Sequence, residues 1–152
     1  MLSQTGEYVL RVVVYLASEG GAACTTHQIA LATLVPEGYL SKLLQALGRA
    51  GMVRSQRGLH GGFVLTRPPE ELTVFDVLAA VDPPQRIRSC PLHIDSHNHQ
   101  LCPLHQRLDE AMALVENAFR KTSIANVINE PTSSRPLCSV PAGRKRRIMN
   151  DE

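Results

Sequence analysis

The sequence predicts a mainly α-helical protein that carries one small β wing. Two observations support this fold class: apolar residues recur at helical spacing along most of the chain, and the clearest pair of β-prone segments is short and glycine-joined. A chain of 152 residues is long enough to bury a self-sufficient core. No run of about eighteen apolar residues and no signal-peptide pattern is present, so we expect a cytoplasmic protein without membrane contacts.

Three helices are expected before Gly51. The first is indicated by apolar residues on one face, Leu10, Val13, Val14 and Ala17, and it ends before Gly20-Gly21. The second begins after Thr25, because Thr25 and Gln28 have the spacing of a capping box. Pro36 suits the first turn of the third helix. The buried face of that helix comprises Leu40, Leu43, Leu44 and Leu47.

The other face of the third helix is polar, and two β-prone pieces follow it. The polar residues are Tyr39, Ser41, Lys42, Gln45 and Arg49. The β-prone pieces span residues 52–55 and 62–66, and we expect Gly58, Gly61 and Gly62 to supply positive φ angles in the turn between them. Two short helices, a polar-faced helix and a hairpin together describe a winged helix-turn-helix domain, which we assign to residues 1–82.

Charge along the chain indicates what this domain binds. The whole chain has a net charge of only +2, but residues 35–67 hold Lys42, Arg49, Arg54, Arg57 and Arg67 against Glu37. A helix with Tyr, Ser, Lys and Gln can enter the major groove of double-stranded DNA, while Arg54 and Arg57 can reach phosphates or the minor groove. His60, in the turn, could contact a phosphate. No arrangement of catalytic residues is evident, so we do not expect an enzyme.

The second half of the chain predicts a long helix. Thr73 caps a short helix that ends before Asp82, and residues 83–102 form a linker loop. Residues 103–129 contain an apolar stripe, Leu104, Leu108, Ala111, Met112, Val115, Ala118 and Phe119, followed by a short helix from Thr122. Because one helix cannot bury such a stripe against itself, we expect a homodimer. Residues 130–152 are rich in Pro, Ser and basic residues, which predicts a disordered tail.

Several stretches resemble the Rrf-two family of bacterial winged-helix regulators. They are GEYVLRVVVYLAS, the long stretch YLSKLLQALGRAGMVRSQRGLHGGFVLTRPPEELTVFDVLAAVD, and CPLHQRLDEAMALVENAF. The resemblance runs to about residue 128, and its most specific part lies between Arg57 and Glu71. It implies a homodimeric transcriptional regulator that binds a partly palindromic operator. The helix at 36–50 would lie in the major groove, and Arg57 would reach the minor groove.

The loop CPLHIDSHNHQLCPLH at residues 90–105 allows three interpretations. Cluster-binding family members carry three cysteines here with a histidine or a partner-subunit acidic residue as fourth ligand. This resemblance implies a two-iron two-sulfur cluster on Cys90, Cys102, His105 and Glu7, although Ser96 replaces the middle cysteine. Zinc could instead bind Cys90, Cys102 and two of His93, His97, His99 and His105. Free or reversibly oxidised thiols without metal are the third interpretation.

These interpretations predict different proteins. With a cluster or reactive thiols, the chain would sense redox state, nitric oxide or iron-sulfur status and pass that signal to DNA binding. The alternative function is a zinc-binding or metal-free protein-interaction module with a degenerate wing. Salt-dependent DNA binding discriminates the two.

Overall fold

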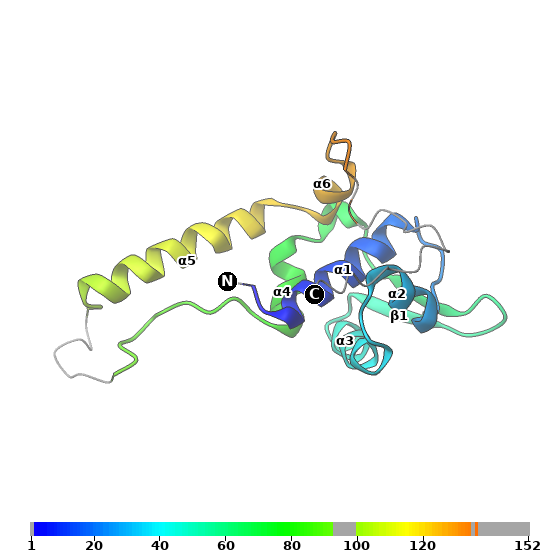
Figure 1. The fold of residues 1–152 in the computed structure, drawn as a ribbon, viewed down its shortest axis with the longest axis horizontal. Helices are drawn as coiled ribbons and strands as arrows, with labels where there is room; N and C mark the ends of the chain where they lie inside the picture. Colours follow the sequence, from blue (N-terminus) through cyan, green and yellow to red (C-terminus); the bar gives the residue numbers. More distant parts are fainter. Residues whose placement is uncertain (1, 93–99, 135, 137–152) are drawn as a thin grey trace, which may run out of the picture.

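The computed structural model describes residues 2–92, 100–134 and 136, and it has the predicted fold class. Within these residues, six α-helices and one hairpin follow in the order α1 (Gln4–Ser18), α2 (Thr26–Thr33), α3 (Glu37–Arg49), β1 (Val53–Gln56), β2 (Gly62–Leu65), α4 (Val74–Val81), α5 (Pro103–Lys121) and α6 (Ile124–Asn129). A short 3-10 helix, Pro69–Glu71, precedes α4. Figure 1 shows a body of short elements from which α5 extends to one side. No described helix is long and apolar enough to cross a membrane.

The core of the body forms around α1. Its Val9, Val12 and Val13 are fully buried, and helices α2, α4 and α6 pack against α1, with α3 packing on α2 and α4. The buried face of α3 consists of the four predicted leucines, Leu40, Leu43, Leu44 and Leu47. Burying a leucine side chain contributes about 1.5–3 kcal/mol. This leucine face therefore fixes which side of α3 points outward.

Capping residues explain where the helices begin. The predicted capping box of Thr25 and Gln28 is present at α2, and Thr73 forms a second capping box with Asp76 at α4. The last helix begins two residues later than we expected, at Ile124, because Ser123 accepts a hydrogen bond from the Asn126 backbone and caps it. Pro36 precedes α3 as its N-cap residue rather than lying in the first turn.

The C-terminal helix α6 is fastened to the body next to α4. The Val74 amide donates to the Thr122 carbonyl at 2.9 Å, and the Ile124 amide donates to the Leu72 carbonyl at 2.8 Å. Ile124 is fully buried in the core. The chain thus leaves the body after α4, passes along α5, and returns to the body at α6 (Figure 1).

Candidate nucleic-acid interface and cysteine-bearing segment

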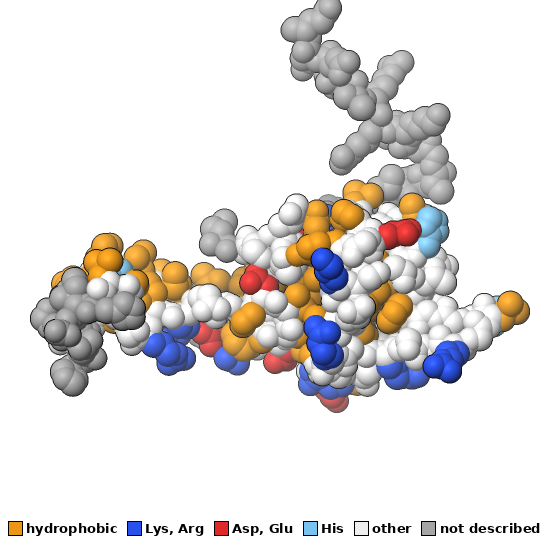
Figure 2. All heavy atoms as spheres, turned by 90° about the horizontal axis from the view of Figure 1, so that it is seen from below, with side chains coloured by type: hydrophobic (Ala, Val, Ile, Leu, Met, Phe, Trp, Pro, Cys, Tyr) orange, Lys and Arg blue, Asp and Glu red, His pale blue; other side chains and the backbone are white. Residues whose placement is uncertain are grey.

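Helix α3 presents an exposed polar face opposite its buried leucines. Ser41, Lys42, Gln45 and Arg49 are all exposed. Within the described part of the chain, Lys42 and Arg49 make no salt bridge, so their charges are available to a ligand. Figure 2, seen from the side on which α3 lies in Figure 1, shows several Lys and Arg side chains over the body. This face can approach a polyanion without first breaking an internal ion pair.

Tyr39 differs from the other polar residues of α3 because it contacts α1. Its hydroxyl hydrogen-bonds the Thr5 hydroxyl, and its ring packs edge-on against Tyr8 with centroids 5.6 Å apart. Tyr8 in turn accepts a hydrogen bond from Gln4 at 3.0 Å. Only 37% of Tyr39 is exposed. The contact fixes the N-terminal turn of α3 against α1 and leaves an edge of Tyr39 on the surface.

The turn between α2 and α3 contains a feature that the sequence analysis missed. Leu34 ends α2 in the left-handed region with φ of 58°, which is unusual for a residue other than glycine. Its amide donates to the Ala30 carbonyl at 2.9 Å, and the following Val35 is buried. The left-handed residue turns the chain sharply enough for α3 to start at Glu37. The tight turn between the two helices depends on it.

The hairpin of β1 and β2 is braced by Cys24, which lies alongside β2 near the turn. The two strands pair antiparallel, with Val53 opposite Leu65 and Gln56 opposite Gly62. Cys24 extends this sheet, because its amide donates to the Phe63 carbonyl at 3.0 Å and its carbonyl accepts from the Phe63 amide at 2.8 Å. Burial raises the pKa of the Cys24 thiol, which is typical of a structural cysteine. Arg54, Arg57 and His60 lie exposed along the hairpin.

The glycines of this hairpin have different roles. Gly58 and Gly62 adopt positive φ angles as expected, but Gly61 does not. Glycine is required at position 61 because no side chain fits there: a Cβ atom would lie 2.6 Å from the Gln56 carbonyl oxygen. At Gly62 a Cβ atom would lie 2.4 Å from the Cys24 carbonyl oxygen. The hairpin therefore closes tightly at its tip and also against the body.

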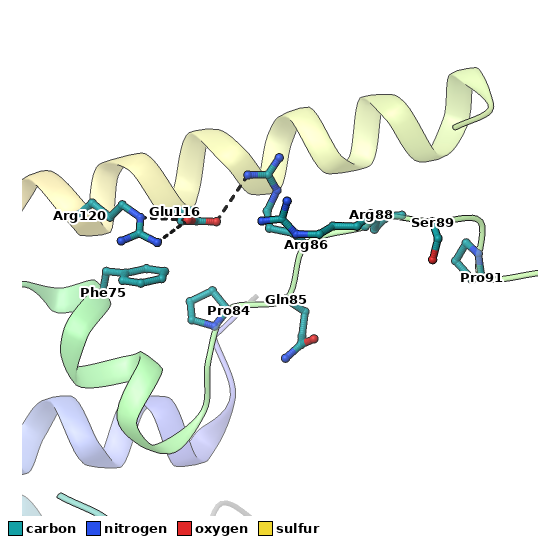
Figure 3. Close-up of a pocket in the computed structure, with 10 residues that line it drawn as sticks. Phe75, Pro84, Gln85, Arg86, Arg88, Ser89, Pro91, Glu116 and Arg120 are labelled. Atoms are coloured by element: carbon teal, nitrogen blue, oxygen red, sulfur yellow. Dashed lines mark hydrogen bonds and ion pairs between the residues drawn. The ribbon is translucent and has the colours of Figure 1, made fainter. Parts of the chain in front are cut away.

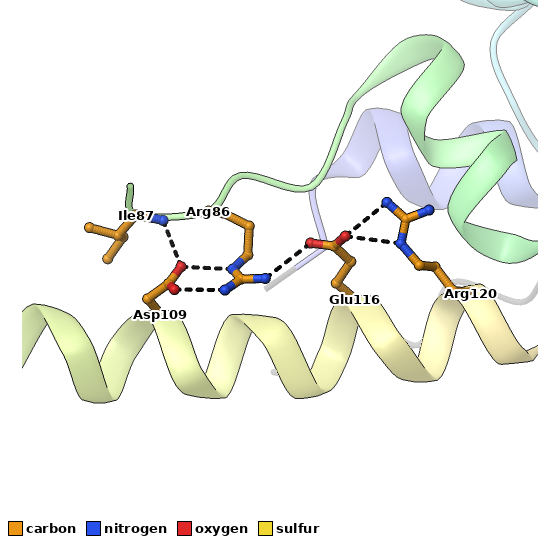
Figure 4. Close-up of polar contacts among 5 residues, drawn as sticks. All are labelled: Arg86, Ile87, Asp109, Glu116 and Arg120. Carbon is orange, nitrogen blue, oxygen red and sulfur yellow. Dashed lines mark hydrogen bonds and ion pairs between the residues drawn. The ribbon is translucent and has the colours of Figure 1, made fainter. Parts of the chain in front are cut away.

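A network of charged residues attaches the segment after α4 to α5. The Arg86 guanidinium donates to both Asp109 carboxylate oxygens, at 2.7 and 2.6 Å, and the Ile87 amide donates to the same carboxylate at 2.9 Å (Figure 4). Arg86 also lies 3.5 Å from Glu116, which binds Arg120 at 2.9 Å. Hydrogen bonding to Arg86 lowers the pKa of Asp109, and that to Arg120 lowers the pKa of Glu116.

The same network borders a groove between this segment and helices α4 and α5 (Figure 3). The groove has a volume of about 600 Å³, and Arg86, Arg88, Glu116 and Arg120 contribute to its lining. The Arg120 guanidinium lies 3.4 Å from the centre of the Phe75 ring, so it links α5 to α4. Two of the three arginines are neutralised by carboxylates of α5.

The predicted metal ligands are only partly assembled. The Cys102 sulfur lies 3.3 Å from Nδ1 of His105, so two donors suited to iron or zinc are adjacent at the start of α5. Cys90 is buried, with 3% of its surface exposed. Glu7 lies in α1, where it pairs with Arg11 at 3.0 Å. Among the described residues no three His, Cys, Asp or Glu side chains form a metal-binding group. His93, His97, His99 and Ser96 fall outside the described residues.

Comparison with known proteins decides the family. A family model described as Rrf2, iron-dependent transcriptional regulator, matches residues 2–130. The chain belongs to the Rrf2 family. The transcriptional regulator CymR of Bacillus subtilis is 34% identical over 149 residues, covering 97% of this chain and 96% of that protein. Protein aau3 of Rhizobium meliloti is 33% identical over 149 residues, which cover 97% of this chain and 94% of that protein.

Solved structures of other regulators have the same fold. The structure of CymR, the global cysteine regulator of B. subtilis, superposes with a TM-score of 0.68 at 23% identity, covering 83% of this chain and 94% of that one. The structure of T. potens IscR superposes with a TM-score of 0.67 at 23% identity, covering 83% of this chain and 84% of that one. This chain is thus a winged-helix transcriptional regulator of the Rrf2 family, which is not a family of enzymes.

Proposed function

We propose that this Rrf2 protein is a homodimer that binds a partly palindromic operator through residues 1–82. In this proposal α3 lies in the major groove, and the side chains that face the DNA are Ser41, Lys42, Gln45 and Arg49. The exposed edge of Tyr39 also contacts the DNA. The hairpin brings Arg54, Arg57 and His60 to the minor groove and the phosphates. The observation that carries the proposal is the exposed polar face of α3, whose Lys42 and Arg49 form no salt bridge within the described residues and which lies next to a braced basic hairpin. The complete hairpin argues against a degenerate wing.

Dimerisation along α5 is supported by the apolar side chains that α5 leaves exposed. None of its 19 residues is buried, yet it carries Leu104, Leu108, Met112 and Val115 at exposures of 38–64%. They recur every three or four residues and so form one stripe, separate from the face that holds Asp109 and Glu116. Hydrophobic side chains (orange) gather on the extended arm in Figure 2. Packing this stripe against its copy in a second chain would remove it from water.

The sensor, in this proposal, is the segment of residues 83–102 together with His105 at the start of the dimerisation helix. Cys102 and His105 would hold a metal, and a two-iron two-sulfur cluster would supply redox and nitric oxide reactivity when bound. Glu7 belongs to the body, whereas Cys102 and His105 lie at the far end of α5 (Figure 1), so Glu7 would join them only from a second chain. Cys90 would supply the second thiolate. Zinc and metal-free thiol chemistry remain the alternatives for the same residues.

DNA binding is tested by selecting duplexes from a random library with the purified protein and measuring affinity by fluorescence anisotropy. Arg57→Ala should weaken binding to the selected duplex, and Arg107→Ala, a change at an exposed arginine of α5, should leave it unchanged. Equal affinity of the Arg57→Ala variant and the wild type for the selected duplex would refute the proposed interface.

The metal assignment is tested separately by anaerobic purification, an absorption spectrum, and iron, sulfide and zinc analysis. Visible absorption with equal iron and sulfide, lost in Cys90→Ala, Cys102→Ala and His105→Ala variants, supports the cluster. One zinc per chain would assign zinc instead. A colourless, metal-free protein after reconstitution would leave thiol chemistry as the mechanism.

A further inference from the structure

Leu59 has the most exposed large apolar side chain in the part of the chain that the structure describes, with 96% of its surface exposed. It lies in the turn between β1 and β2, two residues after Arg57 and next to His60. In Figure 2 hydrophobic and histidine colours meet at the far tip of the hairpin. A single exposed leucine is ordinary on a protein surface. At the tip of a basic hairpin, however, its position suggests a specific contact.

The hairpin holds this side chain away from the body in a defined place. Within the turn, the Gly61 amide donates to the Gly58 carbonyl at 3.0 Å, and no Cβ atom fits at Gly61 because of the Gln56 carbonyl. Just after the turn, Cys24 and Phe63 exchange two backbone hydrogen bonds. These contacts within and beside the turn limit the conformational entropy that the hairpin would lose on binding. Leu59 is thus presented outward on a closed, ordered turn.

We propose that Leu59 is an apolar wedge that enters the DNA minor groove and partly unstacks one base step. The inference rests on the proposed DNA-binding function and adds a residue without charge to it. Arg54 and Arg57 on the same hairpin would contact phosphates and the minor groove nearby, which brings the tip to the groove. Leucine cannot hydrogen-bond a base edge, so its contribution comes from apolar contact. Proteins that bind the minor groove use such side chains to kink DNA.

The wedge predicts a form of sequence preference that arginine contacts alone do not give. Pyrimidine–purine steps such as TA and CA/TG unstack more easily than other steps. The operator should therefore favour one of these steps under each hairpin tip, two per palindrome. Replacing that step by a stiffer one should weaken wild-type binding, and the penalty should disappear when Leu59 is truncated.

The experiment uses the full-length protein and the duplex that the wild type selects. Dyes at the two ends of the duplex report bending, and 2-aminopurine at the candidate base steps reports unstacking. Leu59→Ala and the polar variant Leu59→Asn are compared with Leu59→Met, which keeps an apolar wedge, and with Leu114→Ala, a control at another leucine with 72% exposure. Because Leu59 is 96% exposed, all Leu59 variants should keep the wild-type melting temperature.

We expect Leu59→Ala and Leu59→Asn to lose roughly tenfold in affinity, the change that loss of one apolar contact produces. They should also lose the bend and the 2-aminopurine signal, with the salt dependence unchanged because phosphate contacts remain. Leu59→Met and Leu114→Ala should behave as the wild type. Wild-type affinity and bend in Leu59→Ala would overturn the wedge. If the wild type selects no duplex at all, the proposed DNA-binding function itself fails.

Discussion

Arg86 and Asp109 form a two-pronged ion pair between segments that are 23 residues apart in the chain. Both side chains are largely shielded, with exposures of 26% and 20%. Because the Ile87 amide binds the same carboxylate, the pair aligns the backbone that leads to Cys90 along α5. The pair thus links the segment before Cys90 to α5, and the contact of Arg120 with Phe75 links α5 to α4.

Arg86→Gln should release the segment from α5. The substitution removes the charge and the paired geometry that a guanidinium offers to a carboxylate. Amide hydrogen exchange measured by NMR should show that the protection factor of the Ile87 amide falls by about tenfold or more. This is the effect expected when a hydrogen bond to a charged group is lost. Arg107→Gln is the matched control, because Arg107 pairs with Glu110 on an exposed part of the same helix. Unchanged Ile87 protection in Arg86→Gln would show that the pair does not hold the segment.

Attachment of the segment should depend on pH only under acid conditions. The pKa values of Asp109 and Glu116 are lowered by hydrogen bonds from Arg86 and Arg120, respectively. A carboxyl group whose pKa is lower in the folded state stabilises that state at any pH above its pKa in the unfolded chain, which is about 4. This stabilisation is lost as the pH falls through the pKa of the folded state. Protection of the Ile87 amide, corrected for intrinsic exchange, should be constant from about pH 5 to 8 and should fall below about pH 4. Asp109→Asn should abolish that acid transition.

Lys42→Ala should weaken DNA binding and also reduce its dependence on salt. A lysine that contacts one phosphate contributes about one unit to the slope of log affinity against log salt concentration. The measurement is a salt titration of affinity for the selected duplex and for an unrelated one, and both slopes should fall alike. Lys121→Ala, a change at the end of α5, serves as the control. An unaltered slope for Lys42→Ala would mean that Lys42 does not contact a phosphate.

Gly62→Ala should destabilise the protein by about 2 kcal/mol or more, as expected when a residue other than glycine is forced into a strained backbone with a steric clash. Its Cβ atom would meet the Cys24 backbone, which braces the hairpin. Gly38→Ala is the control, because its Cβ would meet nothing within 4 Å and alanine favours a helix. Urea denaturation should therefore show opposite signs for the two variants.

Leu108→Asp should convert the proposed dimer to a monomer. The charge would lie in the apolar stripe of α5, where a partner helix would have to bury it. Leu114→Asp is the matched control, since Leu114 lies six residues on and thus about 120° around the helix. Sedimentation velocity should give a monomer for the first variant only. A dimer in both would exclude the stripe as the interface.

The local elements were predictable because each depends on residues close together in the chain. The capping box of Thr25 and Gln28 and the leucine spacing of α3 can both be recognised from their spacing in a helix. The outward set Ser41, Lys42, Gln45 and Arg49 follows from that leucine face by exclusion. By contrast, the left-handed Leu34 was not predictable, because leucine carries no intrinsic preference for that conformation.

The sequence by itself determined the helices, the hairpin and the family, since periodicity, capping boxes and the motif from Arg57 to Glu71 are all local patterns. Only the tertiary structure decided which distant residues meet. The Tyr39 contacts with Thr5 and Tyr8, the pairing of Cys24 with Phe63, and the Arg86 pair with Asp109 each join residues 23 to 39 positions apart along the chain. Such contacts depend on how whole elements orient around the α1 core, and no local pattern encodes that orientation.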